Sequence, residues 1–197
     1  MTIQQKTALV MAGGTGGHIF PGLAVAKALI DKGWRVVWLG SMGTVSSPSM
    51  ESKIVPAQSG GGYAIAFESI AFGGLRGKGL LTQLLLPIRL TKALWQSREV
   101  LKRVQPDVVI GMGGYISFPA GLMARQLKIP LVLHEQNSVA GMANKVLAGV
   151  ADRVFAAFPK AIAKAQWVGN PLRVEFLNQP SPESRFAERT GPLKVLV

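Results

Sequence analysis

The sequence predicts an α/β protein built on a doubly wound parallel sheet with Rossmann-like connectivity. Strand and helix signals alternate over most of the 197 residues, and glycine-rich or polar turns follow several of the apolar strands. Alternation of this kind is typical of a parallel sheet with helices on both faces. The chain is also long enough for one α/β domain with a well-buried core.

The first strand is expected at 7–12, because this run is short, apolar and followed by glycine. A helix follows, with Pro21 in its first turn and Gly33 at its end. Between them, Met11–His18 (MAGGTGGH) joins a strand to a helix N-terminus through glycines, which presents backbone N–H groups to an anion. We interpret it as a phosphate- or diphosphate-binding loop with an acid–base candidate, His18, at its lip.

Two other nucleotide-binding patterns fit this loop poorly. A dinucleotide-binding G-x-G-x-x-G match begun at Gly14 requires glycine or alanine at the position of Ile19, and the second strand (35–39) is followed by Gly40 rather than by an acidic residue. The Walker pattern fails because no Gly-Lys-Ser or Gly-Lys-Thr closes the loop. A nicotinamide or flavin enzyme is therefore the weaker interpretation.

The remaining elements follow from the same patterns. Further strands are expected at 63–70, 108–110, 129–133 and 153–157, and helices at 84–104, 120–127 and 140–148. The Gly/Ser-rich connection between Gly40 and Tyr63 is expected to be a flexible loop. The helix after the fourth strand is expected to be capped by Ser117.

Two more segments at strand ends repeat the chemistry of the first loop. Gly111–Tyr115 is a second glycine turn, and His134–Asn137 is a polar cluster. Ligand sites in such sheets form outside the carboxyl ends of the strands, so a shared anion-binding cleft is favoured. The alternatives are tight turns for the glycines and a structural hydrogen-bonded pair for His134 and Glu135.

The positive charge is concentrated in one segment. The net charge is +12, and residues 72–103 carry seven basic side chains against Glu99 alone. Such a field attracts nucleic acid, anionic lipid or phosphorylated substrates. No nucleic-acid-binding motif is present and aromatic residues are not interleaved with the basic ones, so no nucleic acid partner is expected.

A basic, glycine-rich stretch at 71–79 precedes a leucine-rich stretch at 80–88, which predicts a segment at the membrane interface. The alternative is that these leucines belong to the core. The residues expected to meet the membrane are Arg76, Lys78, Leu80, Leu81, Leu84, Leu85 and Arg89. No apolar run approaches the roughly 20 residues that span a bilayer. The absence of cysteine and of a secretory signal fits a cytoplasmic protein.

Five signatures occur in order: MAGGTGGHIFPGLAVAKAL, GLRGKG, PDVVIGMGGYISFPAGLMA, LVLHEQNSVAGMANK and VGNPLR. With them, the whole chain resembles the N-terminal half of the bacterial peptidoglycan glycosyltransferases of the MurG family. The resemblance implies a GT-B fold, in which residues 1–178 form a Rossmann-like acceptor-binding domain. Residues 179–197 are then an inter-domain segment and the first strand of a donor-binding domain.

The resemblance also implies a reaction. These enzymes transfer N-acetylglucosamine from UDP-N-acetylglucosamine to a lipid-linked muramoyl pentapeptide, which converts lipid I to lipid II. An inverting displacement without metal or cofactor is expected, and the sequence contains no Asp-x-Asp pair. The partners are UDP-N-acetylglucosamine (mostly through the donor domain), the lipid I acceptor and an anionic membrane surface, at the cytoplasmic face of the bacterial inner membrane as a peripheral protein.

The isolated chain is expected to be inactive. Two alternatives are a peripheral membrane or partner-binding module without catalytic activity, and a GT-B transferase with another acceptor.

The expected reaction needs a base, and His18 is the candidate, because imidazole suits proton transfer near neutral pH and the loop directs this side chain into the cleft; a phosphate-positioning or helix-capping role is its alternative. Glu135 is a second catalytic candidate, or a residue that orients its neighbours. The expected substrate-binding residues are Gly13, Gly14, Thr15, Gly16, Gly17, Gly113, Gly114, Tyr115, Asn137 and Arg173.

Overall fold

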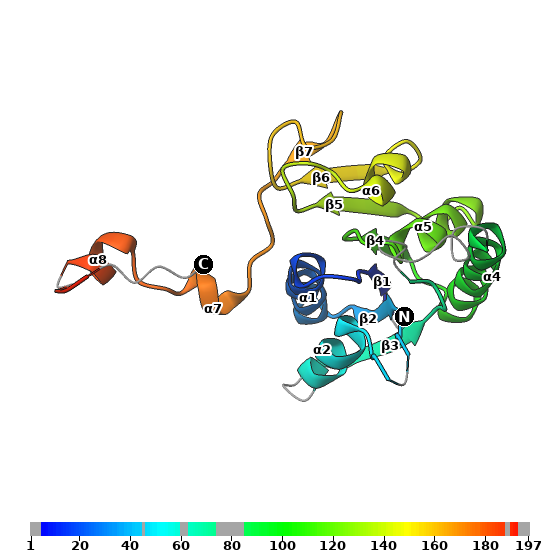
Figure 1. Cartoon of the computed structure of the whole chain (residues 1–197), viewed down its shortest axis with the longest axis horizontal. Helices are drawn as coiled ribbons and strands as arrows, with labels where there is room; N and C mark the ends of the chain where they lie inside the picture. Colours follow the sequence, from blue (N-terminus) through cyan, green and yellow to red (C-terminus); the bar gives the residue numbers. More distant parts are fainter. Residues whose placement is uncertain (1–4, 45, 60–62, 74–84, 188–189, 193–197) are drawn as a thin grey trace.

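The computed structural model describes residues 5–44, 46–59, 63–73, 85–187 and 190–192. Within them, an all-parallel seven-stranded sheet forms the centre of the molecule, with the strand order β3-β2-β1-β4-β5-β6-β7 (Figure 1). The doubly wound sheet predicted from the sequence is confirmed. The strand order reverses between β1 and β4, and such a switch point opens a crevice at the carboxyl ends of the strands.

The strands are β1 (Thr7–Met11), β2 (Arg35–Gly40), β3 (Ile65–Ser69), β4 (Val108–Gly111), β5 (Leu131–Glu135), β6 (Arg153–Ala156) and β7 (Gln166–Trp167). The helices are α1 (Gly16–Asp31), α2 (Met50–Ser59), α4 (Leu86–Val104), α5 (Ser117–Gln126), α6 (Met142–Leu147), α7 (Val174–Leu177) and α8 (Pro182–Phe186). The predicted strands and helices are thus present with small shifts of their ends, while β7 and the helices α2, α7 and α8 were not predicted.

Helices cover both faces of the sheet, because successive side chains of a strand point to opposite faces. In β1, Leu9 and Met11 join a core that includes residues of α4, α5 and α6, whereas Val10 joins a second core with residues of α1 and α2. Every residue of β1 is buried, as expected for a central strand of a parallel sheet.

Helix α1 lies unusually close to the sheet. A Cβ at Gly22 would lie 2.8 Å from Cη2 of Trp38, a fully buried side chain of β2. The Trp38 indole N–H donates to the Ala12 carbonyl at 3.2 Å, which ties the end of β1 to the same ring. This packing holds the N-terminus of α1 directly beyond the end of β1.

Two local predictions were wrong. The segment between Gly40 and Tyr63 is not a flexible loop throughout, because residues 50–59 form α2 and bury Glu51 and Val55 completely. Ser117 does not cap α5 either: it is the first helical residue, it is buried, and its hydroxyl donates to the Gly113 carbonyl at 2.9 Å.

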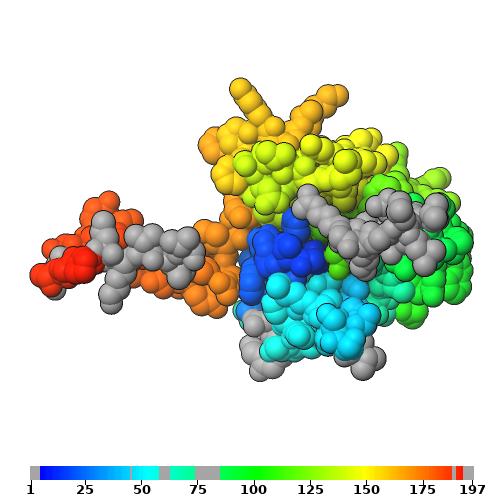
Figure 2. All heavy atoms as spheres, viewed as in Figure 1, coloured from blue at the N-terminus to red at the C-terminus, as the bar shows by residue number. Residues whose placement is uncertain are grey.

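Beyond β7 the chain runs through α7, which lies beside α1 and lines a pocket with it, to α8, which stands clear of the body formed by the sheet and its helices (Figures 1 and 2). Neither helix has a buried residue. Residues 193–197, predicted to be the first strand of a further domain, lie outside the described part of the chain.

Candidate functional site

The two glycine loops meet at the carboxyl edge of the sheet, where the strand order reverses. A Cβ at Gly114 would overlap the carbonyl oxygen of Gly13, so the two backbones are in direct contact. Gly113 and Gly114 also have positive φ, +102° and +84°. Only glycine combines this conformation with so close an approach. The loops that the sequence predicted to share a cleft therefore lie side by side.

The first loop ends at the N-terminus of α1. Thr15 is the N-cap residue, and its side chain makes no capping hydrogen bond. Gly16 and Gly17 follow in the first turn, where the N–H groups of an α-helix have no intrahelical partner. A hydroxyl, free N–H groups and the positive end of a helix dipole together favour an anion at this point.

Glu51, a buried carboxylate that was not predicted from the sequence, holds the first loop by a hydrogen bond. Glu51, at the start of α2, accepts hydrogen bonds from Gly14 N at 3.3 Å and from Ser41 N at 3.2 Å. A Cβ at Gly13 would lie 2.6 Å from its Oε1. The Gly14 N–H is therefore used within the protein, and the groups placed for an anion are those of Thr15, Gly16 and Gly17.

His18 lies between the first loop, the second loop and the end of β5. Its Nδ1 is 2.7 Å from Oε1 of Gln136, which follows β5. A Cβ at Gly113 would lie 2.8 Å from the imidazole Cε1, so the ring packs on the backbone of the second loop. The ring is half-buried, which leaves part of it open to a ligand.

The second histidine, His134, continues this network into the protein. Gln136 Nε2 is 2.9 Å from the His134 carbonyl oxygen and 3.1 Å from His134 Nδ1. His134 Nε2 is 2.9 Å from the carbonyl oxygen of Gly169. Burial lowers the pKa of His134, and this outweighs the opposing effects of the Gly169 carbonyl and of Glu135. His134 is therefore neutral near pH 7.

Glu135 is fully buried and saturated with hydrogen-bond donors. Its Oε1 accepts from Asn137 N and Nδ2 at 2.9 and 2.8 Å, and its Oε2 accepts from Gly141 N and Asn144 Nδ2 at 3.1 and 3.0 Å. Burial acts to raise the pKa of Glu135, but these four bonds together hold it below its usual value. This arrangement suits a carboxylate that orients Asn137 rather than one that takes up a proton.

Tyr115 belongs to the second glycine loop, and its ring packs against Gly14 of the first loop. A Cβ at Gly14 would lie 3.2 Å from its Cε1, and its ring packs edge-to-face on Phe72 with centroids 6.4 Å apart. Burial and the nearby Glu51 carboxylate raise the pKa of Tyr115, while a hydrogen bond with Ser41 lowers it. The phenol is therefore protonated at neutral pH and can donate a hydrogen bond.

Arg173 reaches the site from the N-cap of α7. Its guanidinium carbon lies 4.6 Å from the ring centroids of both Phe20, on α1, and Phe176, on α7. Stacking between two rings fixes the plane of a guanidinium without using its N–H donors. A Cβ at Gly16 would lie 3.2 Å from the Phe20 ring, which places this stack beside the first turn of α1.

The predicted membrane residues fall only partly within the described chain. Arg76, Lys78, Leu80, Leu81 and Leu84 lie outside it, while Leu85 and Arg89 stand at the start of α4 and are exposed. The same helix exposes Ile88 and Trp95 by 68% and 63%, around a hollow of about 560 Å³ that Pro87, Thr91 and Lys92 also line. The exposed start of α4 is therefore apolar and basic together.

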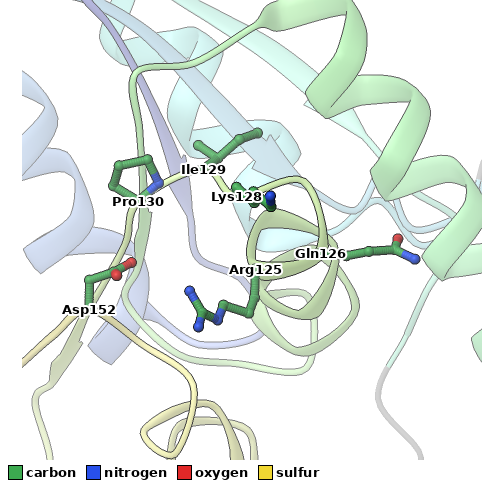
Figure 3. Close-up of a pocket in the computed structure, with 6 residues that line it drawn as sticks. All are labelled: Arg125, Gln126, Lys128, Ile129, Pro130 and Asp152. Atoms are coloured by element: carbon green, nitrogen blue, oxygen red, sulfur yellow. The ribbon is translucent and has the colours of Figure 1, made fainter.

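A different pocket lies at the opposite edge of the sheet, between the end of α5 and the starts of β5 and β6 (Figure 3). It has a volume of about 440 Å³ and is lined by Arg125, Gln126, Lys128, Ile129, Pro130 and Asp152. Asp152 accepts a hydrogen bond from Leu131 N at 2.8 Å, so its carboxylate holds the backbone at the start of β5. This pocket is separate from the predicted site.

Among the described residues, no group of three or more histidine, aspartate or glutamate side chains could hold a metal ion. In the same ranges, no helix combines the length and apolar character needed to cross a membrane.

Comparison with known proteins places the chain among sugar-transfer proteins. Residues 8–156 match the model of the glycosyltransferase family 28 N-terminal domain. The chain is 64% identical, over all of its length, to 49% of a protein from Polaromonas sp. that is named UDP-N-acetylglucosamine–N-acetylmuramyl-(pentapeptide) pyrophosphoryl-undecaprenol N-acetylglucosamine transferase. A protein of the same name from Polaromonas naphthalenivorans is also 64% identical, over 98% of this chain and 52% of that protein.

A solved structure agrees with these relatives. The crystal structure of MurG from Acinetobacter baumannii covers 95% of this chain with a TM-score of 0.74 and 36% identity, and the match spans 50% of that structure. The chain thus spans about half the length of the curated relatives it matches.

Proposed function

The chain belongs to the glycosyltransferase family 28 N-terminal domain family, and from this premise we propose that it is the acceptor- and membrane-binding half of an N-acetylglucosaminyl transferase. The donor would be UDP-N-acetylglucosamine and the acceptor a lipid-linked muramoyl pentapeptide, as in the conversion of lipid I to lipid II. The names of its relatives, about 64% identical, support this choice of substrates.

One observation carries the proposal. The N-terminus of α1, both glycine loops and the His18–Gln136 pair converge at the switch point of the sheet. Thr15, Gly16 and Gly17 offer donors to a diphosphate, and Tyr115 and Asn137 offer hydrogen bonds to sugar hydroxyls. The stacked Arg173 offers a planar fork to phosphate oxygens.

The chemistry would be an inverting displacement. The acceptor sugar hydroxyl attacks the anomeric carbon of the donor, its proton passes to His18, and UDP leaves. Because Nδ1 of His18 is held by Gln136, Nε2 is the ring nitrogen that can take the proton. Glu135 already accepts two hydrogen bonds from Asn137, so it would position that residue and would not act as the base. Neutralisation of the leaving diphosphate would come from helix N–H groups and Arg173, without a metal ion.

The exposed start of α4 would hold the protein on an anionic membrane as a peripheral protein, near the lipid-borne acceptor. Ile88 and Trp95 offer apolar surface, and Arg89 and Lys92 offer positive charge for lipid phosphates. We propose the acceptor-binding domain as residues 1–178 and the inter-domain segment as 179–197. A membrane-binding module without catalysis would use the same α4 surface, but it gives no role to the polar network at His18.

The proposal is tested in the full-length protein that carries this sequence. His18→Ala should lower kcat for sugar transfer to a lipid-linked muramoyl pentapeptide by about 10²–10⁴-fold, because a general base contributes on that order. The KM for the acceptor should change little.

Arg125→Ala, in the pocket at the opposite edge of the sheet, is the control and should keep wild-type turnover. Equal losses in kcat and in acceptor binding would make His18 a binding residue instead. Wild-type turnover of the His18 variant would contradict the proposed site.

A further inference from the structure

We infer that Gln136 is a positioning residue that fixes opposite tautomers on the two histidines, so that His18 carries its proton on Nδ1 and His134 carries its proton on Nε2. The catalytic meaning of this arrangement rests on the proposed function, whereas the tautomers themselves do not. No histidine other than His18 and His134 occurs in the chain.

The orientation of the Gln136 side chain is decided by a backbone carbonyl. The His134 carbonyl oxygen lies 2.9 Å from one end of the amide, and a carbonyl oxygen can only accept a hydrogen bond. That end must therefore be the NH₂ group. Gln136 is only 5% exposed, so water cannot easily satisfy a reversed amide.

The amide oxygen then faces His18. Oε1 lies 2.7 Å from His18 Nδ1 and cannot donate, so the proton of this bond belongs to Nδ1. A neutral ring protonated there has its lone pair on Nε2. The close packing on Gly113 holds the ring in this position, because no side chain could fit between them.

The same amide sets the opposite state at His134. Its second N–H points to His134 Nδ1 at 3.1 Å, which must accept, and His134 Nε2 lies 2.9 Å from the Gly169 carbonyl, to which it must donate. Each hydrogen bond in the series from Gly169 to His18 therefore has one defined direction. The proton on one ring nitrogen is set by the partner of the other, as is usual for functional histidines.

For the proposed reaction, this order places a lone pair on His18 Nε2, the nitrogen that Gln136 does not hold. A His18 ring protonated on Nε2 could not accept the proton of a hydroxyl at that atom. Gln136 would thus act through His18, without itself touching the reacting atoms.

The test uses the 197-residue chain with ¹⁵N-labelled histidine, in which NMR reports two rings and identifies the protonated nitrogen of each. At alkaline pH, His18 should be protonated on Nδ1 and His134 on Nε2. The variant His18→Ala assigns the signals. A His18 ring protonated on Nε2, or the same tautomer on both rings, would overturn the inference.

Two variants isolate the role of the amide. Gln136→Met removes both functions of the side chain and should shift His18 to a mixture of tautomers, while His134 keeps Nε2–H through Gly169. Gln136→Glu retains an oxygen for His18 Nδ1 and should retain its Nδ1–H state. Gln126→Met, on the exposed end of α5, is the matched control and should leave both spectra unchanged. A His18 tautomer unaffected by Gln136→Met would refute the positioning role.

Activity separates this inference from the proposed function. In the full-length protein, Gln136→Met should lower kcat at least tenfold with KM for the donor within twofold, and Gln136→Glu should restore part of the loss. If NMR finds the stated tautomers and their loss in the Met variant but kcat is unchanged, the tautomer assignment stands and His18 is not the base. If NMR finds other tautomers, the inference fails whatever the activity.

Discussion

At the scale of single residues, the site depends on contacts that admit little variation. The second glycine loop touches the first at backbone distance, and Glu135 receives hydrogen bonds on both of its oxygens. Neither feature supplies a catalytic group. Both determine where Thr15, His18 and Asn137 lie, so their loss is expected to act on stability and on the site together.

Gly114→Ala should destabilise the fold by about 2–3 kcal/mol, because a Cβ would overlap the Gly13 carbonyl and the residue has φ of +84°. Urea unfolding measures this as a lower midpoint at unchanged m-value. Gly141→Ala is the matched control, since nothing lies within 4 Å of a Cβ there, and its effect should stay within about 1 kcal/mol. Equal effects of the two substitutions would contradict the proposed backbone contact.

Glu135→Gln should cost about 2–3 kcal/mol near neutral pH, because an amide NH₂ would face N–H donors in a buried position. The pKa of Glu135 is lowered in the folded protein, so its ionised form stabilises the fold above the unfolded pKa of about 4.3. That contribution is lost as the pH falls through the lower, folded pKa.

The difference in unfolding free energy between wild type and Glu135→Gln should therefore be constant from neutral pH to about pH 5.5 and shrink below about pH 4.3. Urea titrations at a series of pH values measure it. A difference that stays constant down to about pH 3 would exclude a lowered pKa for this carboxyl.

At the scale of elements, the ends of helices position the polar groups of the candidate site, and the faces of helices form the core and the exposed surface. Helix α1 brings its N-terminus to the switch point because Gly22 allows close packing on Trp38. Helix α2 inserts Glu51 under the first loop. Helix α4 buries Ala93, Val100 and Leu101 on one side and exposes Ile88 and Trp95 on another.

The double variant Ile88→Ser/Trp95→Ser should lose at least tenfold in binding to vesicles containing anionic phospholipid. Burial of each large apolar side chain in the membrane is worth on the order of 1.5–3 kcal/mol. Both residues are exposed, so the unfolding midpoint should hardly change.

Phe158→Ser/Val168→Ser replaces apolar residues that are 48% and 52% exposed near β6 and β7, and it serves as the control for general loss of apolar surface. Vesicle co-sedimentation measures both variants. Equal losses would mean that α4 is not the membrane-binding element.

At the scale of the whole molecule, the chain carries the proposed acceptor-binding half of a transferase. Its site lies open at the carboxyl edge of the sheet, and the segment that carries Arg173 leads away from the body through α7 and α8 (Figure 1). The relatives are about twice as long as the match. The binding of the leaving UDP is thus expected to need residues beyond this chain.

The 197-residue chain alone should therefore bind vesicles that carry a lipid-linked muramoyl pentapeptide diphosphate more strongly than vesicles without it, yet show no sugar transfer from UDP-N-acetylglucosamine. Co-sedimentation and a radiolabelled transfer assay measure the two properties, with the full-length protein as the positive control. Transfer by the chain alone would place a complete donor site within it. Equal binding to both kinds of vesicle would remove the acceptor diphosphate as a ligand of the glycine loops.

Much of the fold could be predicted from the sequence, because short apolar strands and amphipathic helices are local patterns. The strands at 108–110 and 153–157, for example, occur as β4 and β6 with their ends shifted by one residue. The segment 50–59 was not recognised as a helix, because its neighbours are rich in glycine and serine and its buried residues contact parts of the chain distant in sequence.

The class of sheet and the loops that gather at its carboxyl edge follow from the amino-acid sequence alone, since periodicity and glycine placement are local. The pairing of the polar groups, in contrast, depends on how the folded chain packs. Glu51 lies 37 residues from Gly14, and Gln136 lies 118 residues from His18. No local pattern encodes such pairs, because the direction of a hydrogen bond depends on which groups the packed helices and strands bring within about 3 Å of each other.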